Sequence, residues 1–193
     1  DVYKRQEKKY NGQGVSACAT CDGFFYRKRT VAVVGGGDTA CEEALYLAGL
    51  CKKVYMIVRK PYLRASDVMR KRVEDNEKIE ILYEHNTLGL FGEEGAHLVK
   101  RKGEPDEERY DIAIDGFFLA IGHKPNTDVF RPFVDCDETG YIKTINGTPR
   151  TNVEGVFAAG DCTDPNYRQA IVAAGSGCKA ALEAERWLTE HNL

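Results

Sequence analysis

Short apolar runs alternate with helical repeats along the first half of the chain. Runs rich in Val and Ile lie at residues 30–34, 54–58 and 79–83. The first run stops at a glycine triplet, a pattern typical of a strand buried on both faces. Alanines at helical spacing predict a helix that Asp38 caps and Gly49 ends, and Ser66 caps a second predicted helix over residues 66–76. The order βαβαβ indicates a parallel sheet with helical crossovers.

The pattern changes after residue 95. Apolar runs at residues 96–101, 110–114 and 117–121 predict antiparallel strands, inserted on one face of the first unit. Gly122 opens a segment that breaks the pattern and is the candidate boundary. Beyond it, the predicted elements are strands at 141–144 and 156–159 and a long helix at 169–190. The predicted fold is α/β, a Rossmann-like three-layer dinucleotide-binding domain with an antiparallel insert, followed by a smaller piece.

Composition indicates a globular protein. The 193 residues include 27 Lys and Arg, 30 Asp and Glu and 42% hydrophobic residues, with a formal charge of −3. This balance offers no basic face for nucleic acid, so we expect no such partner. No apolar run is long enough for a membrane span and no signal peptide opens the chain, so we expect a cytoplasmic protein. Of seven cysteines, only Cys18 and Cys21 are close in sequence, which indicates reduced thiols and one special pair.

A glycine-rich turn follows the first predicted strand. Residues Gly35, Gly36, Gly37, Asp38, Thr39 and Ala40 fit the dinucleotide fingerprint G-x-G-x-x-A. The glycines allow a tight turn and a close approach to a pyrophosphate, which the N–H groups at the helix start attract. An ordinary glycine turn is the alternative, and the position between a buried strand and a helix favours the dinucleotide site.

Basic residues follow the second predicted strand. NAD sites place an acidic residue here to bind the ribose 2′-hydroxyl, whereas this chain has Arg59, Lys60 and Arg64. Cations at this position suit a 2′-phosphate, so the sequence predicts NADPH rather than NADH. A solvated basic loop is the alternative.

The pair Cys18-x-x-Cys21 precedes the first predicted strand. Thiols at this spacing can close a small disulfide, and neighbouring groups often stabilise one thiolate. Zinc is the competing interpretation, but a tetrahedral site needs four ligands and the chain has no second C-x-x-C pair, so we expect no metal; accidental spacing is a third. Asp22 is either a proton donor and acceptor for these thiols or a turn residue before Gly23.

Reduction of a disulfide by a nicotinamide normally requires a flavin between them. An apolar run ends at Asp161, and Arg168, Gln169 and Ala170 then open the last predicted helix. A helix start beside an acidic strand end can hold a diphosphate and a polyol chain. This segment is the candidate FAD site.

Four ordered motifs carry a family resemblance. They are Cys18-Ala19-Thr20-Cys21-Asp22-Gly23, Gly35 to Ala40, Ala120 to Asn126, and Ala159-Gly160-Asp161 through Ala170. In this order they resemble low-molecular-weight bacterial thioredoxin reductases from about Gly12 to the end. The resemblance implies a homodimeric flavoenzyme in which NADPH reduces FAD, FAD reduces the cysteine pair, and the dithiol reduces thioredoxin.

The resemblance also assigns roles to residues. Cys21 corresponds to the sulfur facing the flavin, Cys18 to the one exchanging with thioredoxin, and Asp22 to the proton donor and acceptor. Contacts to the 2′-phosphate are implied for Arg59, Lys60 and Arg64, and contacts to FAD for Asp161, Arg168, Gln169 and Ala170. Two positions depart from the family pattern: Val58 stands in place of a common His, and Lys60 in place of a second Arg.

The implied domains are an NADPH-binding domain with the redox pair at residues 7–122 and the closing part of an FAD-binding domain at 123–193. The chain does not begin with Met, and residues 1–6 resemble a translated sequencing adapter. We therefore expect a truncated chain that lacks the N-terminal half of the FAD domain, binds FAD poorly and turns over little. Alternatives are the flavoprotein reductase of a peroxiredoxin and a non-catalytic NADPH-binding module.

Overall fold

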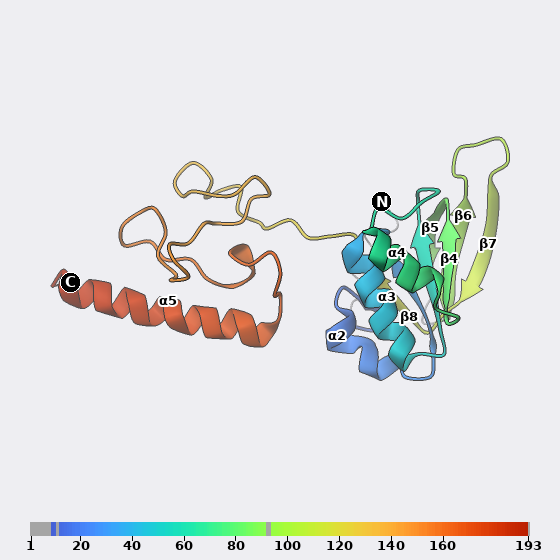
Figure 1. The fold of residues 1–193 in the computed structure, drawn as a ribbon, viewed down its shortest axis with the longest axis horizontal. Helices are drawn as coiled ribbons and strands as arrows, with labels where there is room; N and C mark the ends of the chain where they lie inside the picture. The colour runs from blue at the N-terminus through green and yellow to red at the C-terminus, as the bar shows by residue number, and fades with distance from the viewer. Residues whose placement is uncertain (1–8, 11, 92–93, 193) are drawn as a thin grey trace. The chain divides into compact units, whose positions relative to one another are not determined.

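The computed structural model describes residues 9–10, 12–91 and 94–192 (Figure 1). The expected adapter segment, residues 1–6, lies outside them. The chain divides into two compact units between Gly122 and His123. Each unit has an apolar core of its own, as expected of a structural domain.

A five-stranded parallel sheet forms the centre of the first unit. Its strands lie in the order β1 (Val15–Ser16), β8 (Gly116–Leu119), β2 (Thr30–Val34), β3 (Lys53–Val58) and β4 (Ile79–Tyr83). Val31 and Val33 belong to one core cluster, and Ala32 between them belongs to another. Successive side chains alternate between the faces of a sheet, so both faces are buried. The predicted strands at 30–34 and 79–83 are confirmed residue for residue.

Helices cover one face of this sheet. They are α2 (Ala19–Asp22), the 3-10 helix η1 (Gly23–Tyr26), α3 (Asp38–Leu50) and α4 (Asp67–Glu74). Ala44 and Leu47 of α3 are buried in the same cluster as Val31 and Val33. The apolar repeat at helical spacing therefore places one side of α3 against the sheet.

The predicted ends of the helices need two corrections. Gly37, not Asp38, is the N-cap of α3. Gly49 does not end the helix, because α3 continues to Leu50 and the N–H of Cys51 still donates to a helix carbonyl. A glycine costs a helix only about 1 kcal/mol, and the buried side of α3 outweighs that cost. Ser66 is the N-cap of α4, as predicted.

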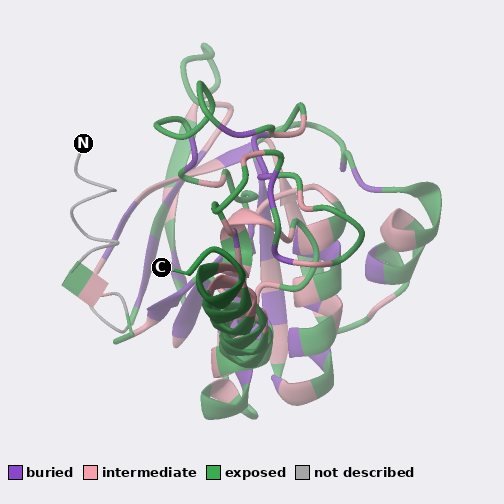
Figure 2. Ribbon diagram, turned by 90° about the vertical axis from the view of Figure 1, so that its left-hand side faces the viewer, coloured by how far each residue is buried: buried purple, intermediate pink, exposed green. Residues whose placement is uncertain are grey.

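A three-stranded antiparallel sheet covers the opposite face. Its strands lie in the order β5 (His85–Leu90), β6 (Gly95–Lys100) and β7 (Glu108–Ala113). Leu98 and Ile112 pack into the cluster that contains Ala32 and Ile57 of the parallel sheet. The unit thus has three layers, with the mostly buried parallel sheet in the middle (Figure 2), which confirms the predicted fold class.

The antiparallel prediction is wrong for residues 117–121. Strand β8 runs parallel to both β1 and β2. The antiparallel sheet fills the connection between β4 and β8, and the chain then returns to the central sheet on the far side of β2. A parallel neighbour always requires such a long crossover, so proximity in sequence does not identify the partner strand here.

The second unit contains α5 (Ala170–Glu190) and the 3-10 helix η2 (Gly160–Cys162), with loops between Gly122 and η2. Gln169 is the N-cap of α5, so the predicted helix is confirmed. The strands predicted at 141–144 and 156–159 are wrong, because over the described residues each segment forms only a single bridge. A strand needs a ladder of partners to be stable. None of the described helices has the length and apolar character needed to cross a membrane.

Candidate functional site

The glycine turn between β2 and α3 has the geometry that the fingerprint requires. Gly35 has a φ of +148°, and a Cβ there would overlap the Ala120 carbonyl oxygen and approach the Ala40 Cβ within 2.8 Å. A Cβ on Gly37 would meet nothing within 4 Å. The first glycine therefore permits the turn, the second leaves its outer side open to a ligand, and Ala40 packs beneath the turn.

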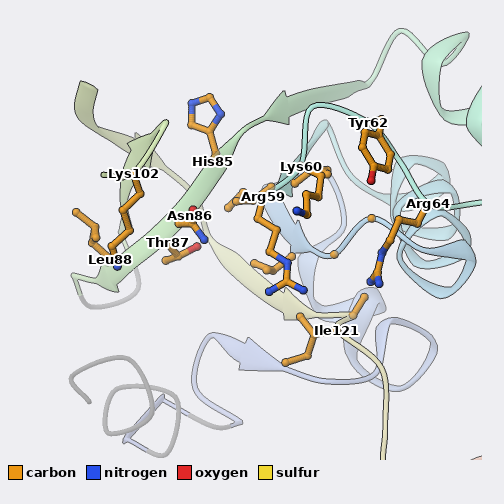
Figure 3. Close-up of a pocket in the computed structure, with 16 residues that line it drawn as sticks. Arg59, Lys60, Tyr62, Arg64, His85, Asn86, Thr87, Leu88, Lys102 and Ile121 are labelled. Carbon is orange, nitrogen blue, oxygen red and sulfur yellow. The ribbon is translucent and has the colours of Figure 1, made fainter. Parts of the chain in front are cut away.

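A cavity of about 590 Å³ lies beside this turn (Figure 3). It is lined by Gly35 and Gly36, by the ends of β2 and β3 and by the residues that follow β8. In open α/β sheets, ligands bind outside the carboxyl ends of the strands. The cavity therefore occupies the position expected for a dinucleotide.

Three predicted cations meet at this cavity. Arg59, Lys60 and Arg64 all line it, from the loop that follows β3 (Figure 3). The backbone N–H of Arg64 donates to the Gly36 carbonyl at 2.6 Å, which ties this loop to the glycine turn. None of the three side chains forms an ion pair with a described residue, and no Asp or Glu is among the described residues lining the cavity. The site is therefore suited to an anion such as a phosphate.

The remaining predicted residues of the turn are not among those that line the cavity. They are Gly37, Asp38, Thr39 and Ala40. The Asp38 carboxylate accepts hydrogen bonds from the Ser66 N–H at 3.0 Å and the Ser66 hydroxyl at 2.8 Å. These bonds lower the pKa of Asp38. Asp38 thus links the start of α3 to the start of α4, while Thr39 is half-buried and Ala40 is fully buried.

Sequence reasoning missed the opposite wall of the cavity. His85, Asn86 and Thr87 of β5 line it together with Lys102, and Figure 3 shows them across from the three predicted cations. His85 is buried: its Nδ1 donates to the Tyr83 carbonyl at 2.6 Å, and its Nε2 lies 2.7 Å from a tyrosine hydroxyl. No local pattern marks these residues, because only the packing of the antiparallel sheet brings them to the cavity.

The cysteine pair is a disulfide at the start of α2. Cys18 is the N-cap, and its Sγ accepts from the Cys21 N–H at 3.2 Å. Cys21 is exposed, whereas Cys18 and Asp22 are half-buried. In the described part of the chain, no group of three or more Cys, His, Asp or Glu side chains is placed to bind a metal.

The predicted FAD residues come together in the second unit. Asp161 lies on η2, Arg168 precedes α5, and Gln169 and Ala170 form the start of that helix. The Arg168 guanidinium donates to the Tyr141 hydroxyl at 3.0 Å.

His123 also lies in this group of residues, although the sequence analysis named it only within the segment at the domain boundary. Burial and the charge of Arg168 lower its pKa, and Asp161 opposes that shift. The motif that opens the second unit therefore lies beside the motif that precedes its long helix.

Comparison with known families decides the relationship. The sequence pattern of the pyridine nucleotide-disulphide oxidoreductases matches residues 4–177. The chain belongs to this family. Members of the family with known names include both eukaryotic and bacterial proteins, so the resemblance is not restricted to bacteria.

Several members of the family are similar over nearly the whole chain. The mitochondrial thioredoxin reductase of Kluyveromyces lactis is 54% identical over 95% of this chain and 54% of its own length. The thioredoxin reductase of Coxiella burnetii is 50% identical over 96% and 61%. The structure of thioredoxin reductase from Giardia duodenalis is 44% identical, with a TM-score of 0.84 over 98% of this chain and 62% of that one. The chain thus spans less than two thirds of each relative.

Proposed function

We propose that this chain supplies the NADPH site and the redox disulfide of an NADPH-dependent thioredoxin-disulfide reductase. The observation that carries the proposal is that one compact unit holds both a dinucleotide-type glycine turn and the Cys18–Cys21 disulfide. In the proposed reaction, NADPH and a proton reduce the disulfide of thioredoxin to a dithiol, and NADP⁺ is released. The names of the similar proteins support this substrate.

In the NADPH site, the open side of Gly37 and the N-terminus of α3 face the pyrophosphate. Arg59, Lys60 and Arg64 bind the 2′-phosphate, which is supported by the position of their cationic side chains at the cavity, where none forms an ion pair with a described residue. An arginine fork and a lysine point charge both form charge-assisted hydrogen bonds with phosphate. The absence of a carboxylate among the described lining residues favours NADPH over NADH.

The proposed domains are an NADPH-binding domain at residues 7–122 and part of an FAD-binding domain at 123–193, and the division into two compact units supports them. FAD, when bound, supplies a carrier between nicotinamide and sulfur. Its contacts in this chain are Asp161, Arg168, Gln169 and Ala170. Their position beside the start of α5 suits a diphosphate, because the N-terminus of a helix attracts anions.

In the exchange step, the reduced pair acts as a dithiol. The Cys18 thiolate attacks one sulfur of the thioredoxin disulfide and forms a mixed disulfide. Cys21 then attacks Cys18, which re-forms the pair and releases reduced thioredoxin. Asp22 directly follows Cys21 and is the proposed proton donor and acceptor for the leaving and attacking sulfurs.

The proposal includes a homodimer and a cytoplasmic location. The family resemblance supports the dimer, which light scattering of the intact protein would test. A reducing compartment is supported by the five cysteines outside the pair, all of which are free thiols.

Cofactor preference tests the NADPH site. In a double variant, Arg59→Gln with Lys60→Gln, we expect the preference for NADPH over NADH to fall at least tenfold, because one charge-assisted hydrogen bond is worth about 1.5–3 kcal/mol. Binding of both nucleotides to the 193-residue chain would be measured by calorimetry. The control is Lys71→Gln with Arg72→Gln, the same change of charge on exposed residues of α4 away from the cavity. An unchanged NADPH/NADH ratio in the Arg59 and Lys60 variant would remove these residues from the site.

The role of the pair is tested in the intact protein that contains this chain. Cys21→Ser should abolish NADPH-dependent reduction of thioredoxin while NADPH still bleaches the flavin absorbance. Cys178→Ser, which removes an exposed free thiol of α5, is the control and should keep both activities. Loss of flavin bleaching together with thioredoxin reduction would contradict the proposed order of electron transfer.

A further inference from the structure

Glu43 is a carboxyl group inside the first unit that the proposed mechanism does not use. It lies on α3 next to Ala44, which is fully buried. Its Oε2 is buried and has no hydrogen-bond partner among the described residues. A buried polar atom without a partner is costly and calls for an explanation.

The Glu43 carboxyl contacts the segment that holds the redox pair. It accepts a hydrogen bond from the backbone N–H of Ala19. Ala19 is the first residue of α2 and is fully buried, and Cys18 is the N-cap just before it. The first N–H groups of a helix have no acceptor within the helix. Glu43 therefore accepts from the Ala19 N–H at the start of the helix that carries the disulfide.

The other end of α2 also packs closely against α3. Gly23 directly follows α2, and a Cβ at that position would approach the Leu47 side chain of α3 within 2.9 Å. The start of α2 bonds to Glu43 and its end packs against the next turn of α3. The disulfide helix is thus fixed to α3 at both ends.

The charge of the Glu43 carboxyl affects how easily the Cys18–Cys21 pair is reduced. Burial raises the pKa of Glu43 to about 7, and the Ala19 N–H opposes this shift. The other titratable groups of α2 and η1 are Asp22, Tyr26 and the two sulfurs when reduced. A thiolate at a helix start is stabilised by the helix dipole, and a carboxylate at the same place acts against it.

We propose that Glu43 is a positioning residue for the Cys18–Cys21 pair, holding the start of α2 through Ala19 and, when ionised, disfavouring the reduced pair. This inference rests on the proposed function in taking the pair as a reversible redox centre. Reduction breaks the sulfur–sulfur bond, adds two electrons and yields one thiol and one thiolate with one proton taken up, or two thiols with two. A negative charge near the new thiolate therefore makes reduction harder.

Two variants separate the roles of shape and charge. Glu43→Gln keeps an acceptor oxygen for Ala19 and removes the charge, whereas Glu43→Leu removes both. Glu42→Gln makes the same change of charge on an exposed neighbour in α3 and is the control. The 193-residue chain would be equilibrated at pH 8 with reduced and oxidised dithiothreitol, whose dithiol supplies the electrons. Alkylation and mass spectrometry of the peptide holding Cys18 and Cys21 would then give the reduced fraction without interference from the other thiols.

We expect Glu43→Gln to shift the equilibrium constant toward the dithiol by about two- to fivefold, the usual effect of one charge at a helix terminus. Glu42→Gln should leave it unchanged. Hydrogen exchange of the Ala19 amide should speed up at least tenfold in Glu43→Leu and stay near wild type in Glu43→Gln, because only the leucine removes its acceptor.

An equilibrium constant in Glu43→Gln equal to that of wild type would overturn the charge effect. Ala19 exchange in Glu43→Leu equal to that of wild type would overturn the positioning role. If Glu43→Leu does not fold, Glu43→Ala, which also removes the acceptor, replaces it in the exchange measurement. Failure of the wild-type pair to reduce and reoxidise reversibly would instead refute the proposed function, so the two failures are distinguishable.

Discussion

Alanine at position 35 is the substitution whose cost is clearest from the structure. The backbone at Gly35 has a φ of +148°, which residues with a Cβ rarely adopt. The added methyl would also overlap the carbonyl oxygen of Ala120 and approach the Cβ of Ala40 within 2.8 Å. Ala120 cannot move freely, because its N–H bonds the Val34 carbonyl at 2.9 Å.

Two terms set the magnitude. A disfavoured backbone conformation costs about 1–3 kcal/mol, and overpacking of a buried contact costs about 1–3 kcal/mol. Gly35→Ala should therefore lower the free energy of unfolding of the first unit by about 2–6 kcal/mol, a large part of the roughly 5–15 kcal/mol typical of a domain.

Urea unfolding of the 193-residue chain would measure this change. Far-UV circular dichroism follows both units, whereas the fluorescence of Trp187, the only tryptophan, reports on the second unit. The dichroism transition should move to lower urea and the fluorescence transition should not. The control is Gly49→Ala in α3, where a Cβ meets nothing within 4 Å; it should stabilise the first unit by about 0.5–1 kcal/mol. If the dichroism midpoint of Gly35→Ala equals that of wild type, the predicted clash between the added Cβ and the Ala120 carbonyl oxygen is refuted.

Two further predictions concern the same unit. Gly37→Ala should weaken NADPH binding at least tenfold, measured by nucleotide fluorescence, while urea stability changes little, because its Cβ faces open space that the pyrophosphate would occupy. Unimpaired binding would contradict the proposed phosphate position. Burial raises the pKa of Glu43 from 4.5 to about 7, so its contribution to stability is full below pH 4.5 and is lost as the pH rises toward 7 and above. The free energy of unfolding of wild type should therefore fall relative to that of Glu43→Gln over this pH range. If the two free energies change in parallel with pH, the raised pKa of Glu43 is disproved.

Local patterns in the sequence predicted an element correctly where its formation depends only on its own residues. Strand β2 is a β-branched run that ends at glycine, and its predicted bounds match the structure. The glycine turn and Arg59 were equally accessible, because the fingerprint fixes their spacing along one βαβ unit. These features could be predicted since their physical causes lie within a few residues.

The missed features depend on distant parts of the chain. The two-residue strand β1 is defined only by its pairing with β8. His85 reaches the cavity because a second sheet packs on the first, and the link of Glu43 to the redox pair exists only because Ala19 lies against it in the fold. Long-range packing creates burial, and burial is what changes the chemistry of such groups.

Helix α3 connects the two chemical parts of the first unit. Its N-terminus follows the glycine turn at the cavity, and Glu43 lies about 7.5 Å further along the axis at a rise of 1.5 Å per residue. The same helix therefore directs its N-terminus toward the proposed phosphate site and holds the start of the disulfide helix. A change that tilts α3 would disturb both places at once, whereas Glu43→Gln changes only the second. Comparing NADPH affinity with the redox equilibrium in that variant thus separates the two roles of the helix.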